Sequence, residues 1–80
     1  MKYVYLIRSL SNRDQRYVGI TSNLEERLGA HNAGSSLHTA KYRPWELVTY
    51  ICFTDNQRAI DFERYLKSGS GRAFASKRLW

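Results

Sequence analysis

Apolar residues along the chain fall into short runs that have the spacing of strands. Residues 3–7 form a nearly continuous run of β-prone side chains, which predicts a strand buried on both faces. Residues 9–16 are polar and turn-rich, and residues 17–20 are again β-prone, so the short connection favours an antiparallel hairpin. The alternating segment 46–53, rich in β-branched and aromatic residues, predicts a third strand.

Two segments carry the start signal of a helix, a capping box in which a Ser or Thr and a later Glu or Gln satisfy each other's amides. The box Ser22–Glu25 predicts a helix over about residues 23–32. The box Thr54–Gln57 predicts a helix over about residues 55–68. Gly34 and Gly69 are placed to end these helices. Residues 35–45 predict a loop with room for one helical turn, and the basic segment 71–80 is compatible with a last short helix.

The expected order of elements is therefore β-β-α-β-α, with room for extra short helices. Three strands and two clear helices predict an α+β fold in which a small three-stranded antiparallel sheet is flanked by helices. The chain has 80 residues without a linker or repeat, so we expect a single domain over residues 1–80. A domain of this size has a modest core.

Composition narrows the class of partner. Thirteen Lys and Arg against seven Asp and Glu give a net charge of +6, which should attract a polyanion. Nucleic acid is one such polyanion, and a basic protein that is merely kept soluble by its charge is the alternative. A membrane surface is not expected, because the chain has neither a basic amphipathic helix with a large apolar face nor an apolar run that spans a bilayer. Cys52 is the sole cysteine, which favours a cytoplasmic location, and we expect it to be a small buried apolar residue.

Helical geometry singles out one acidic residue. The apolar arc of the second predicted helix is formed by Ala59, Ile60, Phe62 and Leu66. At about 100° per residue, Glu63 falls inside this arc. A carboxylate there costs free energy unless it is paired, hydrogen-bonded or bound to a metal. Glu63 is therefore either an acid that swings out to water or to an arginine, or a functional group that needs partners.

Two polar side chains on the first predicted helix border the same small core. Leu24 and Leu28 define the inward stripe of that helix, and Arg27 and His31 project within about 60° of it. Taken alone, Arg27 also fits an arginine that snorkels along apolar surface, and His31 fits a hydrogen-bonded histidine at the edge of the core. Both gain weight as functional residues when Glu63 borders the same core.

Tyrosines on the first two strands complete the set of candidates. Tyr3 and Tyr5 share one face of the first strand because side chains alternate, and cross-strand packing is the preferred interpretation for Tyr3. Tyr17 opens the second strand, and Gly19 allows another backbone or a ligand to come close. The pattern leaves open whether Tyr5 and Tyr17 point toward Glu63.

Taken together, these motifs resemble the GIY-YIG nuclease superfamily over nearly the whole chain. The matching segments are Tyr3-Val4-Tyr5, Tyr17-Val18-Gly19, Leu24-Glu25-Glu26-Arg27-Leu28, His31-Asn32, residues 38–45 and Glu63. The superfamily includes domains of homing endonucleases, of the bacterial excision-repair incision subunit and of structure-selective resolving nucleases, and this chain is most similar to its small single-domain members. The resemblance implies a DNA endonuclease with a role in repair or recombination.

The resemblance also implies a role for each matching residue. Tyr5 and Tyr17 match the phenols that line the site, and the second is proposed to help deprotonate the attacking water. Arg27 matches the arginine that holds the scissile phosphate, Glu63 the carboxylate that binds one divalent cation, Mg²⁺ or Mn²⁺, and His31 a position suggested to assist proton transfer. A free histidine titrates near about 6.5 and a free tyrosine near about 10, so His31 stays an alternative base.

The chain departs from the family pattern at two positions. Tyr3 stands where the name-giving glycine would be, and Ile20 stands where some repair-type members carry a lysine. Without that lysine, water activation has to rest on the metal, Tyr17 or His31. The departure keeps a second interpretation open, a catalytically weak DNA-binding or partner-binding module on the same fold.

Several basic residues are candidates for contacts with the DNA backbone, which would make binding strongly salt-dependent. They are Arg27, Lys41, Arg43, Lys67 and Arg72. For any single one of the last four, an ordinary solvated basic face is the simpler interpretation. No element is clearly suited to reading bases in a groove, so we expect structure-selective or weakly sequence-specific cleavage.

Overall fold

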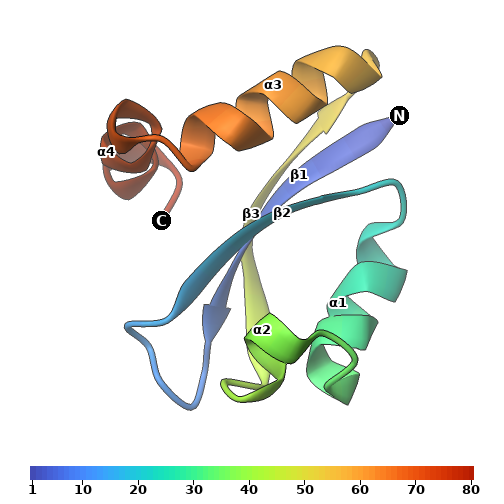
Figure 1. The fold of residues 1–80 in the computed structure, drawn as a ribbon, viewed down its shortest axis with the longest axis vertical. Helices are drawn as coiled ribbons and strands as arrows, with labels where there is room; N and C mark the ends of the chain where they lie inside the picture. The colour runs from blue at the N-terminus through green and yellow to red at the C-terminus, as the bar shows by residue number, and fades with distance from the viewer.

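Three strands and four helices make up the fold of residues 1–80, which is known from a computed structural model (Figure 1). In chain order they are β1 (Lys2–Ser9), β2 (Arg16–Thr21), α1 (Leu24–Ala33), α2 (Leu37–Ala40), β3 (Trp45–Phe53), α3 (Asn56–Leu66) and α4 (Gly69–Arg78). The expected α+β class and order of elements are confirmed, with α2 and α4 as the extra helices. No helix has the length and apolar character needed to cross a bilayer.

The sheet has β1 at its centre, with strand order β2-β1-β3 and antiparallel pairing on both sides. This central position explains why β1 is a continuous apolar run, since neither of its faces meets water. Val4 and Leu6 belong to one core cluster, whereas Tyr5 and Ile7 belong to a second cluster on the opposite face. In the register, Tyr5 lies opposite Gly19 of β2.

The two faces of the sheet are covered by different helices. Figure 1 shows α3 and α4 on one side of the strands, and α1 and α2 on the other. Ala59 and Leu66 of α3 and Ala75 of α4 complete the first core cluster. On the opposite face, Trp45 joins the second cluster, with Leu24 and Leu28 packed against it, as their inward stripe predicts. Each helix layer thus packs against its own face of the sheet and forms a separate core cluster there.

The N-terminal caps of α1 and α3 lie one residue later than the capping boxes predict. Asn23, not Ser22, caps α1 by accepting from the Glu26 amide. Asp55, not Thr54, caps α3 by accepting from the amides at 57 and 58. Asn and Asp cap as well as Ser and better than Thr, so each helix begins after the stronger acceptor.

The C-terminal part of the chain holds further differences from the predicted boundaries. Gly34 does end α1, with φ 81° in the left-handed region that glycine adopts without strain. The helix α3 ends at Leu66, earlier than predicted, because Ser68 accepts from the Gly71 amide and starts a new helix at Gly69. Cys52 is exposed near Met1, so the expectation that it is buried is wrong. Cys52 lies on β3, an edge strand whose outward face is not covered at that point.

Candidate active site

Five residues singled out by the sequence come together around β2, the edge strand next to β1. Tyr5 projects from β1, Tyr17 from β2, and Arg27 and His31 from α1. Glu63 comes from α3, which belongs to the other helix layer. An edge strand is the place where residues from the two layers can meet without crossing the sheet.

Gly19 lets the Tyr5 phenol reach this edge. A Cβ atom at position 19 would collide with the hydroxyl and ring carbons of Tyr5, so the phenol lies directly across the glycine backbone. Any larger residue on β2 at this point would push the phenol away. The close approach that Gly19 predicts is therefore filled by Tyr5.

The Tyr5 hydroxyl is the centre of a buried hydrogen-bond network. It lies 2.8 Å from His31 Nε2, and His31 Nδ1 lies 2.7 Å from Thr39 Oγ1. Arg27 Nε donates to the same hydroxyl oxygen at 3.3 Å. Thr39 is buried, and its backbone oxygen accepts from the indole of Trp45 at 2.8 Å. Tyr5 and His31 thus have fixed positions before any substrate arrives.

Burial keeps both members of this network neutral. Desolvation raises the pKa of Tyr5, against the opposing effects of the Arg27 hydrogen bond and charge. Desolvation, followed by the positive charge of Arg27, lowers the pKa of His31. A neutral phenol donates to Nε2, so we assign the remaining ring proton to Nδ1, which donates to Thr39.

The structure revises the position of His31. One interpretation of the sequence places His31 at the edge of the core. The structure instead buries it completely, with 0% exposure. Its two ring nitrogens contact Tyr5 and Thr39. Thr39, which orients His31, was not a candidate on sequence grounds. The only sign of it was its place in the family-like segment 38–45.

Arg27 is held by Tyr5 and has no acidic partner. The hydrogen bond with Tyr5, more than any other interaction, raises its pKa, and the nearby phenol of Tyr17 adds to this effect. The ion pairs of the protein join other residues, so the charge of Arg27 is not neutralised. A guanidinium that is oriented on one side and unpaired on the other can bind an anion with its remaining donors.

Tyr17 is the more accessible of the two phenols. It is half-buried, its ring meets His31 edge-on at 5.1 Å between centroids, and the Tyr5 ring lies 6.3 Å away. The ammonium of Lys67 lies over its ring, 5.7 Å from the centroid. Two cations, the ammonium of Lys67 and the guanidinium of Arg27, therefore lie next to Tyr17.

Glu63 lies where the helical arc predicts, mostly shielded from solvent, with its side chain 14% exposed. Its Oε2 forms an ion pair with Lys67 Nζ at 2.5 Å, one helical turn later. The negative charge of Glu63 is close enough to contribute to the raised pKa of Tyr5. Lys67 thus links the carboxylate to Tyr17, and the acid belongs to the same cluster as the phenols.

The donor set bears on which metal the cluster suits. No three His, Cys, Asp or Glu side chains gather anywhere in the protein. Mg²⁺ keeps several waters and typically takes only one or two carboxylates from a protein, the rest of its shell being phosphate oxygens. The single shielded carboxylate of Glu63 fits that requirement. The ammonium of Lys67 holds the place beside Glu63 that a cation would take.

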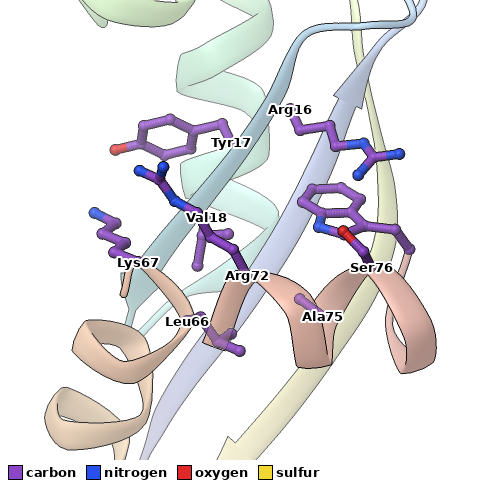
Figure 2. Close-up of a pocket in the computed structure, with 9 residues that line it drawn as sticks. Arg16, Tyr17, Val18, Leu66, Lys67, Arg72, Ala75 and Ser76 are labelled. Atoms are coloured by element: carbon purple, nitrogen blue, oxygen red, sulfur yellow. The ribbon is translucent and has the colours of Figure 1, made fainter. Parts of the chain in front are cut away.

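The other predicted DNA-binding residues divide into two groups. Lys67 and Arg72 line a cavity together with Tyr17, beside the cluster (Figure 2). Lys41 lies over the ring of Tyr42, and Arg43 lies against Gly34. No contact brings these last two basic residues to the cluster.

Comparison with known proteins agrees with this geometry. Residues 1–77 match the GIY-YIG catalytic domain. The chain therefore belongs to the GIY-YIG family of endonuclease domains.

The matching proteins include two kinds of relative. The UPF0213 protein of Clostridium perfringens is 35% identical over 68 residues, which cover 84% of this chain and 71% of that protein. The structure-specific endonuclease subunit SLX1 of Debaryomyces hansenii is 35% identical over 71 residues, 80% of this chain. The match spans only 20% of the Debaryomyces protein. The solution structure of a UPF0213 protein from Bacillus halodurans shares the fold, with a TM-score of 0.57 and 23% identity, over 96% of this chain and 84% of that one.

Proposed function

We propose that this chain is a divalent-metal-dependent endonuclease that hydrolyses DNA phosphodiester bonds. The observation that carries the proposal is the meeting of Arg27, Glu63 and the phenols of Tyr5 and Tyr17 at one edge of the sheet. Hydrolysis of a phosphodiester needs positive charge at the non-bridging oxygens, a cation near the leaving oxygen and a base for water. The cluster offers a group for each need.

Arg27 is proposed to hold the scissile phosphate. Its Nε is already bound to Tyr5, so the guanidinium is oriented before substrate binds. Donors that are preorganised toward developing charge stabilise the transition state without reorganising during the reaction. A planar fork also binds two phosphate oxygens at once, which a lysine cannot do.

Tyr17 is proposed to accept the proton of the attacking water. Of the two phenols, Tyr17 is the half-buried one, whereas Tyr5 is enclosed by His31 and Arg27. We assign Tyr5 and His31 a supporting role, in which Tyr5 guides Arg27 and His31 fixes the Tyr5 hydroxyl. The burial of His31 argues against its use as the direct base.

Glu63 is proposed to hold one divalent cation, Mg²⁺ or Mn²⁺. When bound, the cation supplies Lewis-acid stabilisation of the phosphate and of the leaving oxygen. Lys67 has to release the carboxylate for this to happen. Its side chain is 49% exposed on a flexible stem, so it can swing toward solvent or toward a phosphate.

DNA is the proposed substrate, and cleavage is proposed to be structure-selective or weakly sequence-specific. The net charge of +6 favours a polyanion. The relatives named structure-specific endonuclease subunits support selectivity for DNA shape. Lys41 and Arg43 remain proposed outlying contacts with the backbone. A cytoplasmic location is part of the proposal, since the one cysteine, Cys52, is unpaired.

A cleavage panel with matched variants tests this function. Duplex, single-stranded, flap and junction DNA are incubated with the protein and Mg²⁺ or Mn²⁺. We expect nicking by the parent protein and by Asp61→Asn, which removes one exposed acid from the same helix, but none by Glu63→Gln. Salt-sensitive binding without cleavage under either metal would instead establish the catalytically weak DNA-binding module.

A further inference from the structure

A cavity of about 430 Å³ lies beside the candidate active site, between β2, the end of α3 and α4 (Figure 2). It shares Tyr17 and Lys67 with the site, so the two adjoin each other. Ligand pockets for small organic groups have volumes of about 300–1,000 Å³, so this cavity has room for one nucleotide but not for a duplex.

The walls of the cavity have the two surfaces that a nucleotide needs. Its floor is apolar, formed by Val18, Leu66 and Trp80 among others. Its rim carries the cations Arg16, Lys67 and Arg72 and no acidic residue. Figure 2 shows the Arg72 guanidinium reaching toward Tyr17, on the side of the Lys67 ammonium.

A second feature of the same region is an arginine pair that has no acidic partner. Arg8 and Arg16 lie directly opposite each other on β1 and β2, an arrangement that is destabilising for like charges. Both guanidinium carbons lie over the Trp80 ring, at 5.8 and 5.1 Å from its centroid. None of the ion pairs of the protein includes either arginine.

Stacking on Trp80 holds Arg16 at the rim with its charge unneutralised. An anion bound at Arg16 would relieve the repulsion between the cross-strand arginines, and Arg72 and Lys67 add positive charge on the other side of the cavity. A phosphodiester is the anion expected here, because the cavity shares Tyr17 and Lys67 with the site that is proposed to hold one. The apolar floor then fits the sugar and base attached to that phosphate, in the way that single-strand binding grooves combine cations with aromatic surface.

We propose that this cavity, the Arg16–Trp80 groove, binds the nucleotide that flanks the scissile phosphate on an unpaired DNA strand. The inference rests on the proposed function for the identity of the scissile phosphate. Because the groove holds one nucleotide and not a base pair, it selects substrates whose strand is unpaired beside the cut. The groove thereby gives structure selectivity a physical origin in this chain.

The test is binding of a labelled flap DNA, measured by fluorescence anisotropy with Glu63→Gln as the background and EDTA present, so that no cleavage occurs. Arg16→Gln and Arg72→Gln are compared with Arg58→Gln. Arg58 is exposed and lies nine residues before Lys67, roughly 13 Å along the helix axis. We expect the double groove variant, which carries both Arg16→Gln and Arg72→Gln, to lose tenfold or more in affinity for the flap DNA. Arg58→Gln should lose less than twofold. The slope of log K against the logarithm of the salt concentration should become shallower by about 0.7 for each phosphate contact that the substitutions remove.

Neutral methylphosphonate linkages identify the phosphate. Placed one at a time along the unpaired strand, they should weaken binding at a single position next to the flap junction, and that effect should vanish in the double groove variant. The proposal is overturned if the groove variants behave like Arg58→Gln, if every linkage weakens binding equally, or if the parent does not bind the flap DNA. If the protein binds flap DNA in this way but does not cleave it with either Mg²⁺ or Mn²⁺, the proposed function is overturned and the groove assignment stands.

Discussion

Gly19→Ala tests how the Tyr5 phenol is placed. The added Cβ would collide with the Tyr5 hydroxyl and ring, so either the phenol or β2 has to move. Overpacking of this kind costs about 1–3 kcal/mol. If Tyr5 moves, the buried Nε2 of His31 loses its partner, which costs about 1–3 kcal/mol more. Removal of a strand glycine returns about 0.5–1 kcal/mol.

The expected net loss for Gly19→Ala is therefore about 3 kcal/mol in the free energy of unfolding, measured by urea denaturation. This corresponds to a drop of about 10 °C or more in Tm. Single-turnover nicking should fall by about 100-fold, because Arg27 loses its guide and a displacement of about 1 Å suffices for such a loss.

Gly29→Ala is the matched control. Gly29 is exposed in α1, and a Cβ there meets nothing within 4 Å. It should stabilise the protein by about 0.5–1 kcal/mol and leave nicking unchanged. Stability and nicking of Gly19→Ala equal to those of the parent would refute the placement of Tyr5.

Three further predictions concern the groups around this phenol. Thr39→Val removes the partner of His31 Nδ1, so it should cost about 1–3 kcal/mol in urea unfolding and lower kcat with little change in KM, and Thr39→Ser should restore both. Folding lowers the pKa of His31, so the unfolded chain binds the proton more readily and the free energy of unfolding should fall as pH drops through about 6.5. Urea unfolding over a pH series should show a smaller fall for His31→Gln. Lys67→Met frees the Glu63 carboxylate, so Mn²⁺ should bind about two- to fivefold more tightly by electron paramagnetic resonance, and unchanged affinity would contradict this competition.

Much of the fold is predictable from the sequence because local and long-range signals agree. The apolar run at 3–7 marks a strand buried on both faces, and β1 is the central strand. The helix boundaries are less accurate, since Ser22 and Asn23 are adjacent alternatives as caps and only the folded backbone decides between them. Ser68 likewise starts α4 where the glycine at 69 predicts only the end of a helix.

The sequence names candidate residues for the site but not how their side chains are arranged. Helical angles place Glu63 at the apolar side, yet they give no sign that Lys67 pairs with it. Thr39 carries no periodic signal, because its role depends on how α2 packs against α1. Arg8 and Arg16 lie opposite each other because of the register between β1 and β2. The polar loop between these strands does not fix that register in the sequence, so the pair could not be predicted.

The central claim is that Glu63 holds a cation beside Arg27 and the two phenols, and paramagnetic broadening by Mn²⁺ tests it most directly. In NMR spectra at substoichiometric Mn²⁺, the ring signals of Tyr17 and Tyr5 and the Nε–H signal of Arg27 should broaden first. Glu63→Gln should abolish this broadening, whereas Asp61→Asn should preserve it. Broadening that centres elsewhere, or that persists in Glu63→Gln, would contradict the account.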